Sequence, residues 1–268
     1  MICLTGDVHH MGLNTKDQRY LGGTELDAGI KYLEICKQYG LKATLFITGK
    51  CFKEEPKKID KLLQFANLEI GGHNYFAFKP RLPFKISNRV FGVKNGPYAY
   101  QNWEVRKTLQ IISQNIVTRV VSWRNHGYRH DRNTLAILKK NGIRFYSDHL
   151  DPDAVKPYKE NDMIIVPINV LPDHDFIYHG ALTRGSIDES VLLNSPFQSS
   201  GCTIGQWLGR LKEMVLRVED NQGLSTLLIH PACMEISDGF ETFEKACQFL
   251  SRYANIWMNE AHLLVDSQ

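Results

Sequence analysis

The sequence predicts an α/β fold, a distorted (β/α) barrel of about seven parallel strands that need not close fully, in one domain over residues 1–268. Two observations carry this prediction. Apolar runs of strand length alternate with segments of helical spacing, an order typical of parallel sheets. Four runs also end in an ionisable residue, as strands do at the catalytic face of α/β barrels. These residues are Asp7 and His9 after the first run, then His73, Arg124 and His230.

The first half of the chain alternates strands and helices in a regular order. The run Ile2–Asp7 reads as a strand, and Thr24 with Asp27 forms the pattern of a capping box at a helix start. Two glycines within 68–74 follow an apolar run and predict a sharp turn that presents His73. The remaining elements expected here are strands at 43–47 and 68–72 and a helix at 56–65.

The second half keeps the same alternation. Asp131 is placed to cap a helix, and Gly142 is placed to end it. The expected strands are 120–124, 143–146, 163–168 and 224–229, and the expected helices are 103–115, 131–140, 205–218 and 240–253.

Residues 77–101 interrupt the alternation and predict a loop insertion. The segment holds three prolines and five basic residues, no acidic residue, and aromatic residues between them. A loop of this length is either a solvated surface excursion or a functional element. As the wall of a substrate site, its Arg81, Arg89 and Tyr98 would bind an anionic or sugar ligand together with His126.

Composition and charge argue against several classes of protein. The net charge of +3, without a long basic block, argues against a nucleic-acid partner. No window has the apolar length of a transmembrane segment, and residues 1–4 lead into a strand rather than a signal peptide. We therefore expect a cytoplasmic protein with a small-molecule or oligosaccharide substrate. Its six scattered cysteines form no C-x-x-C pair and are expected to be reduced and buried. The oligomeric state leaves no signal in the sequence.

Four stretches of the chain resemble motifs of the polysaccharide deacetylases with the NodB-homology fold. Lys42–Lys50 is similar to the K-A-T-F-F-V-x-G stretch of that family, and Glu69–His73 is similar to its E-I-G-x-H stretch. Ser122–Tyr128 is similar to F-R-x-P-x-G, with His126 in place of the proline. Leu228–Pro231 resembles the final L-x-x-H motif. The four occur in the family's order and at the predicted strand ends.

The resemblance implies a hydrolase that removes acetyl groups with the help of a divalent metal ion. In the family, one aspartate and two histidines hold the ion. Carried over, Asp7 matches the aspartate base, and His73 matches the first metal histidine. Arg124 matches the arginine that steadies the base, and His230 matches the histidine acid.

Two positions depart from the family's metal-binding pattern. Val8 and His9 stand where the family has its metal aspartate, and Ala77 stands where it has the second metal histidine. A mixed set of histidine and carboxylate ligands suits Zn²⁺ or another first-row divalent ion. The residues expected to hold the ion here are Asp7, His9 and His73, with His10 or His126 as a further ligand.

The sequence leaves three functions open. The first is a metal-dependent hydrolase that removes the N-acetyl group from an acetamido sugar, an intracellular intermediate of surface polysaccharide biosynthesis. The second, favoured by Ala77, is a catalytically inactive member of the same fold that binds a saccharide. The third is a carbohydrate enzyme that uses two carboxylates and no metal. Its support is limited to Asp148, Asp151, Asp153, Asp173 and Asp175.

Overall fold

The strands form one curled sheet, in a computed structural model that describes residues 1–12, 15–77, 87–90, 92–93 and 95–265. The strands are β1 (Ile2–Val8), β2 (Ala43–Ile47), β3 (Leu68–Gly72), β4 (Ser122–Trp123), β5 (Phe145–Tyr146), β6 (Tyr158–Glu160), β7 (Met163–Ile165), β8 (Ser225–Leu228) and β9 (Asn255–Ile256). Eight of them follow the order β6-β7-β5-β4-β3-β2-β1-β8, and β9 pairs with β1. All pairs are parallel except β6 with β7. The sheet curls into a half-barrel, which confirms the predicted incomplete barrel.

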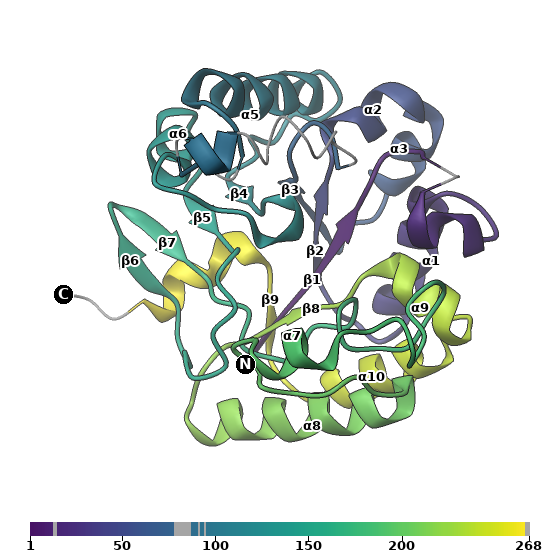
Figure 1. Cartoon of the computed structure of the whole chain (residues 1–268). Coiled ribbons are helices and arrows are strands. Elements are labelled where there is room, and N and C mark those ends of the chain that lie inside the picture. Colours follow the sequence, from purple (N-terminus) through teal and green to yellow (C-terminus); the bar gives the residue numbers. More distant parts are fainter. Residues whose placement is uncertain (13–14, 78–86, 91, 94, 266–268) are drawn as a thin grey trace.

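Helices surround the outside of this sheet, as Figure 1 shows. They are α1 (Glu25–Gln38), α2 (Gly49–Glu54), α3 (Pro56–Leu62), α5 (Tyr98–Ser113), α6 (Thr134–Lys140), α7 (Glu189–Leu193), α8 (Ile204–Asp220), α9 (Pro231–Asp238) and α10 (Glu241–Leu250). The described residues also form a helical stretch at 87–90 and three 3₁₀ helices, η1 (Lys16–Tyr20), η2 (His126–Tyr128) and η3 (Met258–Leu264). No helix in the described part of the chain has both the length and the apolar character needed to cross a membrane.

The register of the parallel strands brings distant ionisable residues to one edge. Asp7 pairs with Phe46 across β1 and β2, and Phe46 pairs with Gly71 across β2 and β3. His73 therefore lies two residues beyond the level of Asp7. On the other side of β1, Thr5 pairs with Leu228 of β8, so the residues that follow β8 reach the same level.

The two glycines before His73 permit close packing of neighbouring rings. Both lie inside β3. A Cβ on Gly71 would lie 2.4 Å from the ring of Phe46, and one on Gly72 would lie 2.4 Å from the ring of Trp123. The turn predicted at the glycines is wrong, because the backbone enters the left-handed region only at Asn74, with φ of 58°.

Apolar side chains fill both faces of the sheet. The larger core lies between the sheet and the helices, and all six cysteines are buried with free thiols, as expected. A smaller core on the other face joins Cys3, Phe46 and Phe145 to Met258 and Ala261 of η3. The final 3₁₀ segment thus covers the inside of the half-barrel.

The side chain of Asn169 bridges the open side of the half-barrel. β7 and β8 are not neighbours in the sheet. The buried Asn169, which follows β7, donates from Nδ2 to the carbonyl of Leu224 at 2.9 Å. Its Oδ1 accepts the backbone N–H of Thr226 at 2.8 Å. The amide of Asn169 therefore replaces part of the missing strand pairing.

The predicted strands are all present, and two helix boundaries are wrong. The helix expected from residue 103 begins at Tyr98, so the end of the predicted loop is helical. The helix expected from Asp131 begins at Thr134 after Asn133, and Asp131 accepts the backbone N–H of Asn133 without capping the helix. The elements that were not predicted are α2, α7, α9, β6 and β9. Residues 78–86, 91 and 94 of the predicted loop lie outside the described residues.

Candidate active site

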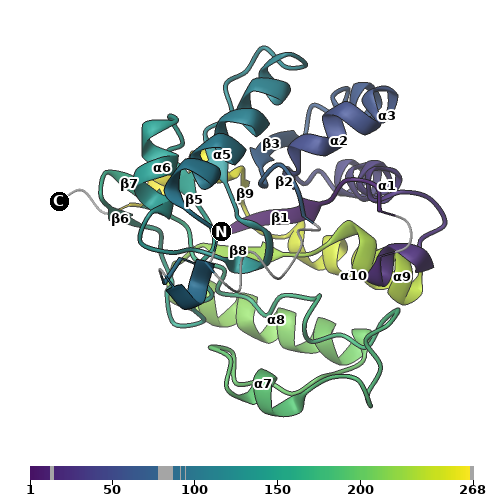
Figure 2. The ribbon, with the colours of Figure 1, turned by 45° about the horizontal axis from the view of Figure 1, so that its top comes forward.

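A cavity of about 720 Å³ opens at the carboxyl ends of the strands. Figure 2 shows β1 between β2 and β8, with α9 continuing the chain after β8. The cavity walls include the segments that follow β1, β3, β4, β7 and β8. Among the lining residues are Asp7, His9, Ala77, His126, Tyr128, Arg129, His174, Asp175, His230 and Cys233.

Three histidines from three strand ends converge on one point. His9 follows β1, His73 follows β3, and His126 follows β4. The Nε2 of His9 lies 3.2 Å from Nε2 of His73 and 3.0 Å from Nδ1 of His126. One ligand nitrogen of each ring lies within 4.8 Å of the other two. The structure thus brings together two predicted metal residues and one residue predicted both as a substrate contact and as an alternative ligand.

The partners of His9 and His73 fix which ring nitrogen carries the proton. The Nδ1 of His9 lies 2.8 Å from Oε2 of Glu25, which also accepts the backbone N–H of His9. The Nδ1 of His73 lies 2.9 Å from the carbonyl oxygen of Arg124. Both partners accept hydrogen bonds, so both Nδ1 atoms carry the hydrogen. When both rings are neutral, as metal ligands must be, the two Nε2 atoms present lone pairs toward each other.

This donor set fits a divalent transition-metal ion. Zn²⁺ bonds imidazole nitrogen at about 2.0–2.1 Å, which places the nitrogens of a tetrahedral site about 3.3 Å apart. The distances from His9 to His73 and to His126, 3.2 and 3.0 Å, are close to that value. Two facing lone pairs at this separation repel each other unless a cation lies between them. The contacts of His9 and His73 to carboxylate and carbonyl oxygens are those typical of zinc-bound histidines.

Asp7 lies beside the three histidines and is held by Arg124. The guanidinium of Arg124 is completely buried and donates from Nη1 to Oδ1 of Asp7 at 3.0 Å. The other oxygen, Oδ2, lies 3.7 Å from Nε2 of His73 and 3.8 Å from Nε2 of His230. Burial alone would raise the pKa of Asp7, but His73 and Arg124 outweigh it and lower the pKa to about 2. The carboxylate is therefore ionised at neutral pH.

His230 faces Asp7 from the opposite side and is bound by Asp173. Its Nδ1 lies 2.6 Å from Oδ1 of Asp173, and its backbone N–H donates to Oδ2 of the same carboxylate at 2.6 Å. Burial favours the neutral ring, but Asp173 and then Asp7 favour the charged ring and raise the pKa of His230 to about 9. His230 is thus a protonated imidazolium at neutral pH.

Sequence reasoning assigned no role to Glu25 or Tyr128, and it named Asp173 only as part of an acidic cluster. Glu25 orients His9, and Asp173 orients His230. Tyr128 lines the cavity, and burial with the nearby carboxylates of Asp175 and Asp7 raises its pKa well above the usual value. The sequence carries a signal for Asp173, since this residue also follows an apolar run, Val166 to Leu171. Glu25 lies inside a helix pattern and carries no comparable signal.

The remaining predicted site residues lie elsewhere. Arg89 is exposed. Tyr98 begins α5, and its ring lies 6.0 Å from Nζ of Lys140. Neither Arg89 nor Tyr98 is among the described residues that line the cavity at Asp7. Arg81 lies outside the described residues. His10 is buried and its ring lies 6.3 Å from that of Phe76. Ala77 does line the cavity, with a methyl group where the family has a ligand.

The aspartates that favoured an enzyme with two carboxylates and no metal do not form one group in the structure. Asp148 accepts hydrogen bonds from the hydroxyl of Tyr146 at 2.6 Å and the backbone N–H of Asn125 at 2.7 Å. Burial raises the pKa of Asp148 to about 7. Asp151 accepts backbone N–H groups of its own turn at Asp153 and Ala154. Asp148 and Asp151 are thus engaged within the fold, whereas Asp175 lines the cavity and the buried Asp173 binds His230.

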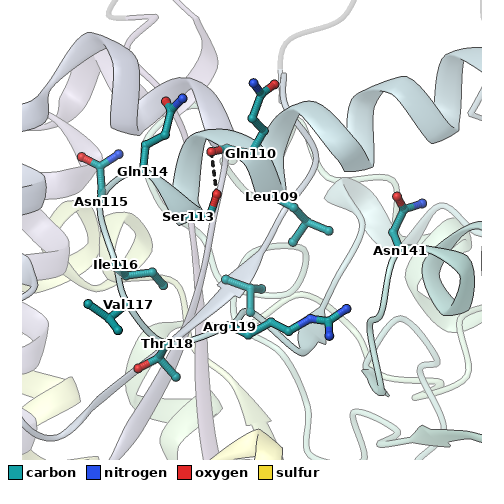
Figure 3. A pocket seen from close by; sticks show the side chains of 11 residues that line it. Leu109, Gln110, Ser113, Gln114, Asn115, Ile116, Val117, Thr118, Arg119 and Asn141 are labelled. Carbon is teal, nitrogen blue, oxygen red and sulfur yellow. Dashed lines mark hydrogen bonds between the residues drawn. The ribbon is translucent and has the colours of Figure 1, made fainter.

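A second cavity, of about 600 Å³, lies at the opposite end of β4 (Figure 3). It is formed by the end of α5, the segment 114–120 and Asn141. Its lining includes the guanidinium of Arg119 but no histidine, cysteine or carboxylate. This cavity therefore lacks groups suited to metal binding or proton transfer, in contrast to the cavity at Asp7.

The chain is similar to known proteins in sequence and in fold. Residues 27–146 match the family model described as polysaccharide deacetylase. No curated protein has a matching sequence. A proposed polysaccharide deacetylase from Mycobacterium smegmatis shares the fold with a TM-score of 0.71 and 14% identity, over 98% of this chain and 89% of that chain. A second proposed deacetylase, from Pseudomonas aeruginosa PAO1, has a TM-score of 0.67 and 14% identity, over 97% and 89%.

The same fold also occurs in a protein with a different printed activity. The Puue allantoinase structure has a TM-score of 0.66 and 13% identity, over 97% of this chain and 88% of that chain. Fold likeness at this identity does not choose a substrate. The matched family model indicates a deacetylase, a hydrolase of C–N bonds other than peptide bonds. The match over residues 27–146 and the shared fold make the chain similar to the polysaccharide deacetylases.

Proposed function

We propose that this chain is a metal-dependent hydrolase that removes the N-acetyl group from an acetamido sugar. One observation carries the proposal: three imidazole nitrogens converge within 4.8 Å, beside an ionised Asp7 and a protonated His230. Hydrolysis of an amide needs an electrophilic centre, a base for water and an acid for the leaving amine. The cavity holds a candidate for each of these parts.

The metal ligands in this proposal are His9, His73 and His126. His9 and His126 take the places of the ligands that Val8 and Ala77 cannot provide. A divalent ion bound there lowers the pKa of water to about 7 and polarises a carbonyl group. Zn²⁺ suits a set of three imidazoles with an open fourth position. Asp7 was expected to be both metal ligand and base. In this proposal it is not a ligand, because three histidines are enough to hold the ion.

Asp7 acts as the base toward the attacking water. Its Oδ1 is occupied by the guanidinium of Arg124, while Oδ2 faces the histidines. Arg124 is itself fixed by Thr5 and Ser147, to which it donates at 2.7–2.9 Å. This anchoring holds the carboxylate ionised and in one orientation while it accepts a proton at Oδ2.

His230 acts as the acid that protonates the leaving amine. Its Nδ1–H is committed to Asp173, so the proton available for transfer is on Nε2, which faces the cavity. Because the pKa of His230 is raised to about 9, the proton is present over the physiological range. Transfer from Nε2 converts the departing nitrogen into a neutral amine.

The proposed substrate is a small acetamido-sugar intermediate of surface polysaccharide biosynthesis in the cytoplasm. A cavity of about 720 Å³ lies within the size range typical of small-molecule sites. Arg129 in the wall could meet an anionic group carried by such an intermediate, and the ring of Tyr128 could contact the sugar.

A catalytically inactive saccharide-binding protein is the second candidate. Ala77 favours it, because a family ligand is absent there and a methyl group lines the cavity instead.

The test measures acetate release from free and nucleotide-linked acetamido sugars, with the chain loaded with Zn²⁺. We expect turnover in the loaded protein. His73→Ala should lose turnover and the ion held by the three histidines, while His262→Ala, at an exposed site, keeps both. If the chain binds the sugar but releases no acetate with any divalent ion, the saccharide-binding function is favoured over the hydrolase.

A further inference from the structure

A second group of metal-ligating side chains lies on the α9 side of the cavity. His174 and His179 come from the segment between β7 and α7, and Cys233 is the third residue of α9. The Nδ1 of His174 lies 3.3 Å from Sγ of Cys233. One ligand atom of each of the three residues lies within 4.8 Å of the other two. This group shares no residue with the three-histidine cluster.

The buried ring of His179 has a nitrogen without a hydrogen-bond partner among the described residues. Its side chain is fully buried, and its Nδ1 lies 2.8 Å from the carbonyl oxygen of Ile177, so Nδ1 carries the hydrogen. Its Nε2 therefore presents a lone pair, and this atom has no hydrogen-bond partner among the described residues. Buried imidazole nitrogens are normally paired, so an unpaired acceptor aimed into a polar cluster marks a binding position.

The carboxylate of Asp17 lies close enough to act as a fourth ligand. Oδ2 of Asp17 lies 4.0 Å from Nε2 of His179. Its other oxygen, Oδ1, accepts the backbone N–H of Ala181 at 3.1 Å, which fixes the orientation of the group. Asp17, His174 and Cys233 all line the cavity, so an ion can reach them from solvent.

We propose that His174, His179 and Cys233, with Asp17, form a second site for a divalent transition-metal ion, of which Zn²⁺ is the best fit. Imidazole and thiolate ligands select such ions over Mg²⁺ and Ca²⁺. Zn²⁺ bonds of about 2.0–2.3 Å place tetrahedral ligand atoms about 3.3–3.7 Å apart, so small side-chain rotations from the present arrangement close the site. As the metal–sulfur bond forms, the thiol proton of Cys233 passes to water.

The same cluster does not suit a nucleophilic cysteine. Burial, followed by the nearby carboxylates of Asp173 and Asp17, raises the pKa of the Cys233 thiol well above its usual value. A reactive cysteine needs a lowered pKa, and none of these neighbours provides it. Burial also lowers the pKa of His174, which keeps that ring neutral, as a metal ligand must be.

Cobalt substitution of the full chain separates the two sites. Co²⁺ bound to thiolate gives a sulfur-to-metal charge-transfer band in the near ultraviolet, whereas Co²⁺ bound only by histidine does not. We expect the metal-free protein to take up two equivalents of Co²⁺ and to show this band. Cys233→Ser should lose the band and one equivalent, and His179→Gln should weaken binding at the same site. His73→Ala should lose one equivalent and keep the band.

Cys202→Ser is the matched control, because Cys202 is a buried free thiol that does not line the cavity. It should keep both ions and the band, and melting curves verify that each variant folds. Absence of the band in the unaltered chain, or its persistence in Cys233→Ser, overturns the second site. Full metal uptake by His73→Ala with the band intact would instead contradict the proposed hydrolytic site.

Discussion

Glu25 determines how His9 is presented to the other two histidines. It accepts hydrogen bonds from both the backbone N–H and the ring of His9, while its other oxygen accepts from Gln18 at 2.7 Å. Loss of such a carboxylate partner typically costs about 10–100-fold in metal affinity. Glu25→Gln should therefore weaken Zn²⁺ binding at the three-histidine site by roughly this factor. Competition with a chromophoric chelator, in a Cys233→Ser background, measures it. Glu34→Gln, at an exposed position of α1, should bind as the parent does.

Asp173 sets the pH range in which His230 can act as an acid. The folded-state pKa of His230 is raised to about 9, so the protonated acid is present below that pH and is lost above it. In Asp173→Asn the main stabilising charge is removed, the pKa of His230 falls, and the loss of kcat begins at lower pH. The kcat–pH profile tests this shift. Asp151→Asn, in a turn away from His230, should leave the profile unchanged, and an unshifted profile in Asp173→Asn would contradict the acid role.

At the residue scale, sequence reasoning located strand-end groups better than their partners. Asp7, His73, Arg124 and His230 could be placed at one edge because each directly follows an apolar run. Glu25 could not be placed, because its role is a contact with His9 across 16 residues and no periodicity encodes that contact. The roles assigned to all these residues stay predictions until the variants are measured.

Within β3, glycine is required at position 72 by the ring of Trp123. A Cβ there would lie 2.4 Å from the ring, and Trp123 is completely buried and cannot move aside freely. Overpacking of this kind costs about 1–3 kcal/mol. Gly72→Ala should lower the free energy of unfolding by about that amount and displace His73. Urea denaturation measures it. Gly209→Ala in α8, where an added Cβ meets nothing within 4 Å, should stabilise by about 0.5–1 kcal/mol. Equal effects of the two substitutions would contradict this account.

The bridge made by Asn169 between β7 and β8 should matter to stability more than most surface contacts. Asn169→Ala leaves the carbonyl of Leu224 and the N–H of Thr226 without this partner in a buried place. Each buried group left unsatisfied costs about 1–3 kcal/mol. We expect a lower melting temperature with metal content unchanged, and Asn194→Ala at the exposed end of α7 serves as the control. A melting temperature equal to that of the parent would show that water replaces the amide.

At the element scale, three of the missed elements share a physical cause. β6 and β9 span three and two residues, and α7 spans five, so no periodic pattern can develop in them. β6 and β9 form because the neighbouring strands β7 and β1 offer backbone hydrogen-bond partners. The longer elements were predictable because a buried face repeats in their sequence over several turns or several alternations.

At the scale of the whole molecule, the half-barrel could be predicted from the sequence. The contacts that bridge its open side and cover its inner face could not. Seven predicted strands in parallel order gave the architecture, and proteins of 13–14% identity share it. The closure depends on the side chain of Asn169 and on the 3₁₀ segment that covers the inner face. Both are contacts between parts far apart in sequence, which local patterns do not contain.

The position of β1 between β2 and β8 has a consequence for synthesis on the ribosome. β1 is translated first but pairs with β8 and β9, and the hydroxyl of Thr5 donates to the carbonyl of Leu227, 222 residues later. At about 5–20 residues per second, the apolar edge of β1 waits roughly ten to forty seconds for this partner. The nascent chain is therefore exposed to edge pairing with other chains, a hazard that chaperones limit. His9, His73 and His126 all emerge well before His230, so a growing chain could capture its metal ion long before it can deliver a proton.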